Sequence, residues 1–208
     1  GSNFCGIRLS WSDTNTMHNN LISGSVYGIT LDSSDINAIS NNTISNNDIG
    51  IYLSHYAVPS TIKNRITYNN IVDNIHYGIN ITSLACENFI HHNYFTNNNG
   101  AASVYDTAHV QACDQNGDNF WNTSTEGNYW SDQTGPDSNQ DGILDVPYVL
   151  DGGVGAKDYY PITTNSVNAL IINAPKEIYE GQEFEVTVSL PNGTPANGAI
   201  VTFDGVPK

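Results

Sequence analysis

The chain has 208 residues, with 21 Asp plus Glu against six Lys plus Arg, and a formal net charge of −15 at pH 7. So few cations argue against a nucleic-acid partner, because phosphate contacts need a basic surface. The same scarcity disfavours polyanionic polysaccharides. No stretch approaches the roughly 20 apolar residues that a membrane-spanning helix needs.

One four-residue phrase recurs along the first half of the chain. It begins with Gly-Ile and closes on a second apolar residue, at positions 6–9, 28–31, 50–53 and 78–81. The first three copies are 22 residues apart (28 − 6 and 50 − 28), and the fourth comes 28 later (78 − 50). A repeat of this length, with the same residue types at the same places, is typical of a solenoid.

Each repeat predicts three short strands. The Gly-Ile-x-Leu phrase places two apolar residues two positions apart, as in a strand with one face inward. Two shorter phrases follow, each beginning with asparagine and containing an apolar residue two positions later. Their asparagines are Asn15, Asn37, Asn64 and Asn88 in one series, and Asn20, Asn42, Asn69 and Asn93 in the other.

The asparagine repeats are explained best by structure. Asparagine tolerates a left-handed backbone better than most residues. Stacked at the rung spacing of roughly 4.8 Å, its side-chain amides would hydrogen-bond along the column. We therefore expect residues 3–100 to form about four coils of a parallel β-helix.

The third coil holds an insertion, Ser54 to Ser60, before its first asparagine phrase. Inserted loops on a rigid solenoid often carry recognition. Aromatic faces stack on sugar rings while polar neighbours fix their orientation. Tyr52, His55 and Tyr56 are therefore the candidate glycan contacts, and a neutral insertion is the alternative.

Candidate catalytic groups are few. Asp13 and Asp35 occupy the same place in neighbouring coils, which would put them about 5 Å apart, the separation used by retaining glycosidases. Ordinary turn chemistry is the alternative explanation. His18, His91 and His92 fall in matching register and are a weaker candidate for a metal or a base.

Residues 101–164 lose the repeat and gain aromatic residues, which we expect to cap the open end of the core. Within them, residues 137–145 carry oxygen side chains at loop positions 1, 3, 5 and 9, with glycine at position 6, as in calcium loops. Tyr148 replaces the glutamate that closes an EF-hand loop, so another carboxylate would have to complete the site. An acidic turn without an ion is the alternative. The predicted calcium ligands are Asp137, Asn139, Asp141, Asp145 and the backbone carbonyl of Ile143.

Residues 165–208 change character again. Alternating segments at 169–173, 183–190 and 199–203 predict three strands. They look like the opening of an immunoglobulin-like domain, which needs about 100 residues and seven strands. We therefore expect a partial domain, truncated or completed by a partner's strand.

Cysteines and sequons bear on the compartment. Three cysteines do not make a disulfide framework. One bridge, between Cys86 and Cys113, could form in an oxidising compartment. Asn-x-Ser/Thr sequons support secretion weakly, because an asparagine-rich chain supplies several by chance. The candidate glycosylation sites are Asn41, Asn80, Asn122 and Asn192.

The coils resemble the right-handed parallel β-helix repeats of NosD-like and carbohydrate-binding/sugar-hydrolase proteins. The stretches 126–132 and 135–161 are similar to the end of such repeats in secreted archaeal surface proteins, which frequently continue into immunoglobulin-like domains. The resemblance covers residues 4–163 and implies the fold. It does not fix the function, because this fold hosts lyases, hydrolases, epimerases and adhesins alike.

We therefore predict an all-β protein with a right-handed, single-stranded β-helix at 3–100, a cap with a calcium-type loop at 101–164, and a partial immunoglobulin-like domain at 165–208. The predicted function is a non-catalytic extracellular surface or sheath module, with a structural, adhesive or glycan-contacting role and stabilised by calcium. One alternative is a polysaccharide-degrading glycosidase or lyase that uses Asp13 and Asp35. The other is a filament or lattice subunit that associates through its first coil or its last domain.

Two absences from the sequence count against an enzyme. The chain has no Asp-Pro-His motif of the kind seen in uronan epimerases. The cations that lyases use to neutralise uronates are nearly missing, since the coils hold only Arg8, Lys63 and Arg65.

Overall fold

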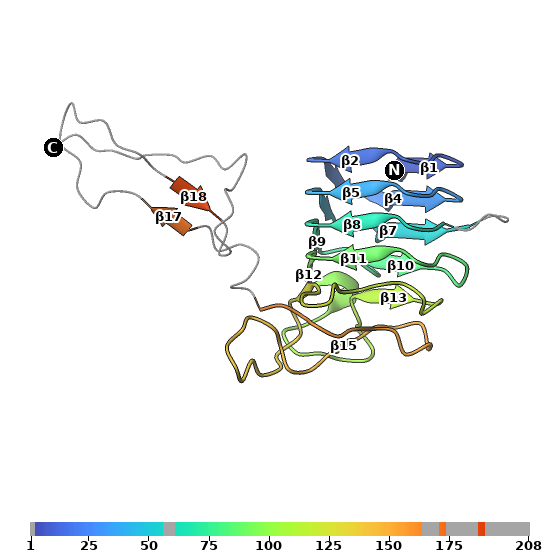
Figure 1. The fold of residues 1–208 in the computed structure, drawn as a ribbon. Coiled ribbons are helices and arrows are strands. Elements are labelled where there is room, and N and C mark those ends of the chain that lie inside the picture. The colour runs from blue at the N-terminus through green and yellow to red at the C-terminus, as the bar shows by residue number, and fades with distance from the viewer. Residues whose placement is uncertain (1–2, 56–60, 164–170, 174–186, 190–208) are drawn as a thin grey trace, which may run out of the picture. The chain divides into compact units, whose positions relative to one another are not determined.

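The structure is a computed structural model that describes residues 3–55, 61–163, 171–173 and 187–189. The chain divides into two compact units, residues 1–163 and 164–208. The first unit is a stack of coils, and successive coils add strands to three parallel sheets (Figure 1). This confirms the predicted all-β solenoid of about four turns.

Each sheet takes every third strand of the solenoid, apart from the last strand of the third sheet. The first sheet consists of β1 (Asn3–Ser10), β4 (Ser25–Asp32), β7 (Ile49–Ser54), β10 (Ile79–Ile81) and β13 (Ala112–Asp114). The second consists of β2 (Thr16–His18), β5 (Ala38–Ser40), β8 (Arg65–Thr67) and β11 (Phe89–His91). The third consists of β3 (Leu21–Ser23), β6 (Thr43–Ser45), β9 (Asn70–Val72), β12 (Tyr94–Thr96) and β14 (Tyr129–Trp130).

Apolar side chains at equivalent positions stack to form the core. In the first sheet Ile29 pairs with Ile51, and Ile51 pairs with Ile79. All three side chains are fully buried. The predicted ladders of apolar residues are therefore confirmed, and their burial supplies the main favourable term in folding.

The glycine that opens each repeat is required by close approach of the next coil. A Cβ added at Gly28 would lie 2.5 Å from the carbonyl oxygen of Gly50 and 2.9 Å from Nδ2 of Asn47. No side chain fits in that space. The constraint is steric contact between coils, which explains why glycine recurs with the same period as isoleucine.

Three columns of side-chain amides run along the solenoid. In each rung the amide oxygen accepts from the backbone N–H and the amide nitrogen of the preceding rung, at 2.8–3.2 Å. The predicted asparagine ladders are therefore present, with a third column that the repeats did not reveal. The columns are Asn15-Asn37-Asn64-Asn88-Asn119, Asn20-Asn42-Asn69-Asn93-Asn128 and Asn47-Asn74-Asn98-Gln111.

Every column ends on a buried aspartate in the cap. Asn119 donates to Asp114 at 3.0 Å, Asn128 to Asp158 at 2.7 Å through its backbone N–H, and Gln111 to Asp132 at 2.5 Å. The three aspartates are fully buried. Each aspartate also accepts a hydrogen bond from an aromatic side chain: Asp114 from Trp121, Asp158 from Trp130 and Asp132 from Tyr148.

The cap closes the core with stacked rings, as predicted. Trp130 lies flat between Phe95 and Tyr148, with ring centroids 4.1 and 4.0 Å away. Phe95 belongs to the last coil and pairs with Trp130 across β12 and β14. The remaining elements of this unit are η1 (Asn98–Gly100), β15 (Tyr148–Val149) and β16 (Lys157–Asp158).

In the second unit, β17 (Ile171–Asn173) and β18 (Thr187–Ser189) form an antiparallel pair. They lie within two of the three predicted strands. The third, 199–203, lies outside the described residues, so the immunoglobulin-like domain stays a prediction. Cys5, Cys86 and Cys113 are free thiols, so the structure does not contain the Cys86–Cys113 bridge.

Candidate functional site

Three aromatic rings from neighbouring strands of the first sheet lie side by side. Phe4 meets Tyr27 edge-on with ring centroids 5.5 Å apart, and Tyr27 stacks on Tyr52 at 4.8 Å. Phe4 is 67% exposed, and both tyrosines are partly exposed. We call these three residues the aromatic row.

Polar groups adjoin the aromatic row. Arg8 donates to Oδ2 of Asp32 at 2.9 Å. Asp32 is 5% exposed, and its other oxygen, Oδ1, has no hydrogen-bond partner among the described residues. A buried carboxylate oxygen without a partner is costly. Because this oxygen is covered, the Arg8 side of the ion pair is the part that is open to a ligand.

The row and the ion pair share one surface hollow of about 290 Å³. Burial, with nearby Tyr27 and Asp32, raises the pKa of Tyr52, so its phenol stays a donor at neutral pH. The hollow therefore offers flat apolar rings, the hydroxyl of Tyr52 as a donor and the exposed guanidinium of Arg8. Its lining residues are Phe4, Arg8, Tyr27, Thr30, Asp32, Tyr52, Ser54 and His55.

The structure brings two of the three predicted glycan contacts together, since Tyr52 and His55 both line this hollow. Tyr56 lies outside the described residues. The sequence prediction missed Tyr27, because the strand register pairs it with Ile49 and pairs Tyr52 with Thr30, so no repeat position links the two tyrosines. It also missed the ion pair of Asp32 with Arg8, which no motif indicates.

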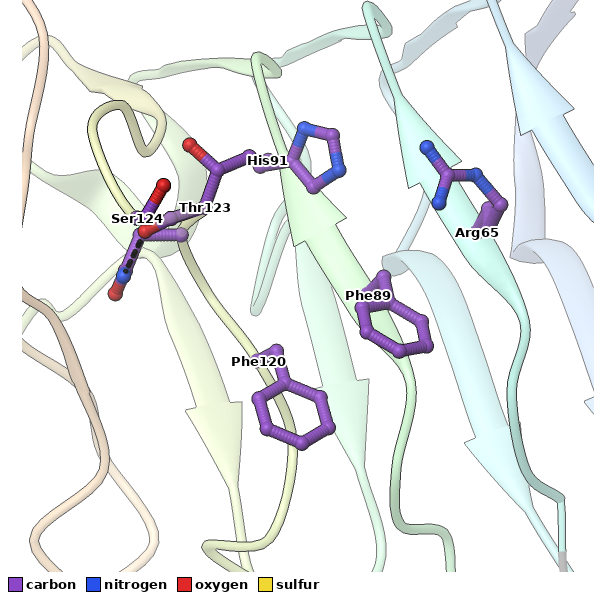
Figure 2. A pocket seen from close by; sticks show the side chains of 7 residues that line it. Arg65, Phe89, His91, Phe120, Thr123 and Ser124 are labelled. Carbon is purple, nitrogen blue, oxygen red and sulfur yellow. Dashed lines mark hydrogen bonds between the residues drawn. The ribbon is translucent and has the colours of Figure 1, made fainter.

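A second hollow, of about 520 Å³, lies on the second sheet where the cap meets the last coil (Figure 2). Phe89 and Phe120 stack along one side, with ring centroids 5.0 Å apart. Arg65 makes no ion pair or side-chain hydrogen bond among the described residues. Figure 2 shows the guanidinium of Arg65 and the ring of His91 facing each other above the two rings. We call this the arginine hollow, lined by Arg65, Phe89, His91, Phe120, Asn122, Thr123 and Ser124.

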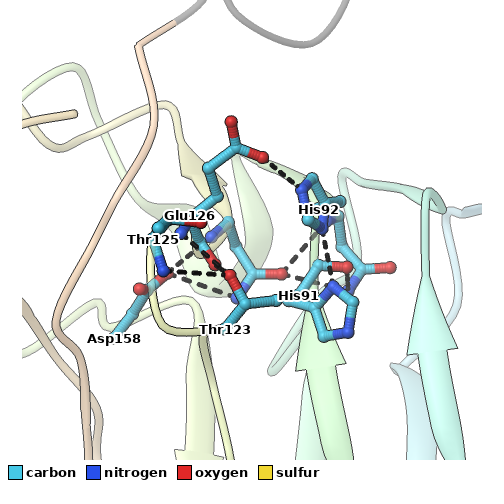
Figure 3. A network of polar contacts seen from close by, with 8 residues as sticks. His91, His92, Thr123, Thr125, Glu126 and Asp158 are labelled. Carbon is cyan, nitrogen blue, oxygen red and sulfur yellow. Dashed lines mark hydrogen bonds and ion pairs between the residues drawn. The ribbon is translucent and has the colours of Figure 1, made fainter. Parts of the chain in front are cut away.

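A hydrogen-bond chain runs into this hollow from the cap (Figure 3). Oε2 of Glu126 lies 2.6 Å from Nε2 of His92, and Nδ1 of His92 lies 2.6 Å from Nδ1 of His91. The Thr123 hydroxyl accepts the N–H of Glu126 at 2.9 Å and so holds the loop that carries this carboxylate.

With both imidazole rings neutral, the chain of contacts fixes their protons. A carboxylate only accepts hydrogen bonds, so Nε2 of His92 must donate to Glu126. Nδ1 of a neutral His92 then accepts the proton of His91 Nδ1. This leaves Nε2 of a neutral His91 with its lone pair exposed to the hollow. Burial, followed by His92 and Arg65, lowers the pKa of His91 to about 4, so the ring is neutral at physiological pH.

The carboxylates proposed for catalysis have backbone partners. Oδ1 of Asp13 accepts the N–H of Asp35, and Oδ1 of Asp35 accepts the N–H of Ile62, both at 2.8 Å. Each aspartate thus bonds to a turn of the next coil, as the alternative of turn chemistry expects. His18 lies in the first coil and is separated from His91 by two intervening strands, β5 and β8, so the structure does not bring them together.

In the predicted calcium loop, the carboxylates accept hydrogen bonds from other groups of the same loop. Oδ2 of Asp137 accepts the N–H of Gly142 at 3.0 Å, and Oδ1 of Asp141 accepts the N–H of Ile143 at 2.9 Å. Oδ2 of Asp145 accepts the Ser138 hydroxyl at 2.6 Å. Calcium binding here stays a prediction.

The candidate glycosylation sites differ in accessibility. Asn41 is exposed, and Asn80 and Asn122 are partly exposed. The side chain of Asn122 is occupied by backbone hydrogen bonds to Thr123 and Tyr159. Asn192 lies outside the described residues.

The coils and the start of the cap also correspond to a known family. A family model described as "Periplasmic copper-binding protein (NosD)" matches residues 1–135, more than half of the chain. The chain belongs to the NosD family. Searches of curated proteins and of solved structures find no match.

The described residues of this NosD family member do not form a copper site. No group of three or more His, Cys, Asp or Glu side chains is placed to hold a metal ion in the part of the chain that the structure describes. His91 and His92 hydrogen-bond to each other through their Nδ1 atoms. The described residues also include no helix long and apolar enough to cross a membrane.

Proposed function

We propose that this NosD family chain is a non-catalytic module of the periplasm or cell surface that contacts a glycan through the aromatic row. The observation that carries the proposal is the cluster of three accessible rings beside the Arg8–Asp32 ion pair. Flat rings stack on the apolar faces of sugars, and polar groups nearby set orientation. The Arg8 guanidinium, on a side chain that is 52% exposed, would donate to sugar hydroxyls.

The rest of the fold supports a rigid display surface. Parallel strands hold the rows of side chains at the fixed spacing between coils. The amide columns and the ring stack hold the cap on the last coil. A ligand that meets the row therefore meets a preorganised surface, which lowers the entropic cost of binding.

The test is a glycan array followed by titration of the best neutral oligosaccharide against the double variant Tyr27→Ala/Tyr52→Ala. We expect the affinity to fall by roughly 10-fold or more, because each lost aromatic contact removes about 1 kcal/mol. Tyr159→Ala is the matched control, since this tyrosine is 56% exposed and lies outside the hollow. Unchanged glycan binding by a folded double variant would disprove the proposed site.

We also propose that calcium binds residues 137–145. The spacing of oxygen side chains supports this part of the proposal, and the short contacts within the loop show that these groups lie near one another. The role would be structural, because binding to the folded state alone stabilises that state. The family description names copper, but no cluster among the described residues supports that metal, and we do not propose it.

A further inference from the structure

We propose that the arginine hollow is a second ligand site, which takes a sugar unit that carries one carboxylate. The site lies on the second sheet and on the cap, whereas the aromatic row lies on the first sheet. The proposal goes beyond the proposed function and does not depend on the row.

Charge singles out this hollow. The chain carries only six Lys plus Arg. Two of the three cations in the coils are paired, Arg8 with Asp32 and Lys63 with Glu87. Arg65 has no such partner among the described residues and faces the hollow. Its planar guanidinium binds a carboxylate through two parallel N–H donors.

His91 adds the complementary polar group. Its Nε2 carries a lone pair in the tautomer that Glu126 and His92 impose. A lone pair accepts from a hydroxyl and repels a carboxylate. The hollow therefore presents donors for an anion at Arg65 and an acceptor for a hydroxyl at His91. A sugar acid carries both groups on one small ring.

The remaining walls suit the same ligand. The stacked rings of Phe89 and Phe120 offer an apolar surface, and Phe120 is 49% exposed. The partly exposed turn at Thr123 and the exposed Ser124 complete the rim. A single free cation serves one carboxylate, so the site fits an isolated acidic sugar. A polyanion would be repelled by a chain of net charge −15.

The experiment titrates the protein at pH 7 and low salt with galacturonic acid, which carries one carboxylate, and with its methyl ester. The ester keeps the ring and removes the charge. We expect the acid to bind wild-type protein at least roughly 10-fold more tightly than the ester, as charge-assisted hydrogen bonds imply. Arg65→Gln should remove this preference, and Phe120→Ala should weaken both ligands.

Lys63→Gln is the matched control, because it removes the same charge from a residue outside the hollow. It should retain the preference for the acid. Equal losses in Arg65→Gln and Lys63→Gln would reveal general electrostatics and overturn the proposal, as would equal affinity of wild type for acid and ester, or binding of neither.

The two proposed sites are separated by the double variant Tyr27→Ala/Tyr52→Ala. It should keep the preference for the acid while it loses the neutral glycan. Loss of the acid preference in this variant would place the anion elsewhere and overturn the second site alone.

Discussion

At the scale of single residues, asparagine acts here as part of the fold. Asn69 is 1% exposed, accepts two hydrogen bonds from Asn42 and donates to Asn93 and to two backbone carbonyls. Such a side chain is satisfied only as an amide. In an aspartate, an oxygen would replace Nδ2 and would face the three acceptor oxygens of Ile39, Thr67 and Asn93.

Asn69→Asp should therefore destabilise the protein by about 3 kcal/mol or more, because it buries a charge against acceptors. Urea unfolding followed by circular dichroism measures the change. Asn41→Asp is the matched control, since Asn41 is exposed and has a positive φ of 55° that both residue types tolerate. Equal losses in the two variants would show that the column is not a specific source of stability.

His91 should give the stability a defined pH dependence. Its folded-state pKa of about 4 lies below the ordinary value of 6.5. Between these values the unfolded chain binds a proton that the folded chain does not, so His91 contributes stability above pH 6.5 that is lost as the pH falls towards 4. Wild type should lose about 1 to 2 kcal/mol more than His91→Gln between pH 7 and 4.5 in urea unfolding. Parallel pH profiles for the two proteins would contradict this.

At the scale of elements, sequence reasoning succeeds where coils repeat. The period places Ile29 over Ile51 and Asn42 over Asn69, because neighbouring rungs are related by one translation. The cap has no repeat, so nothing in the sequence pairs Trp130 with Asp158 or Glu126 with His92 across 34 residues. For the same reason the arginine hollow, half of which belongs to the cap, could not be predicted.

Because of the ring stack, the stability of the protein should be sensitive to substitution of Trp130. Trp130→Ala should cost about 3 to 5 kcal/mol, the range for a buried aromatic residue. It also removes a donor from Asp158, whose pKa burial raises to about 6. Trp11→Ala is the control, because Trp11 is 59% exposed. Thermal unfolding checks both, and similar melting temperatures for the two variants would refute the role of the stack.

At the scale of the whole molecule, the excess of acidic over basic side chains affects stability. A net charge of −15 opposes compaction through self-repulsion, and a bound cation would relieve it. Saturating calcium should therefore raise the melting temperature by roughly 5 °C, as expected for a ligand at about 100 times its dissociation constant.

The calcium effect should be lost in Asp141→Asn. Asp118→Asn is the matched control, because it removes the same charge from an exposed residue outside residues 137–145. It should retain the effect. An equal rise in all three proteins would mean that calcium only screens the surface charge, and no rise in wild type would exclude the site.

The amide columns also give the rod a direction. Each amide oxygen receives its bonds from the coil before it, so Oδ1 of Asn15 and Asn20 points away from the second coil. The far end of every column is an aspartate, which has acceptors only. The direction of the columns therefore dictates the residue that ends them, because the last amide donor needs an acceptor and a carboxylate leaves no further donor to satisfy.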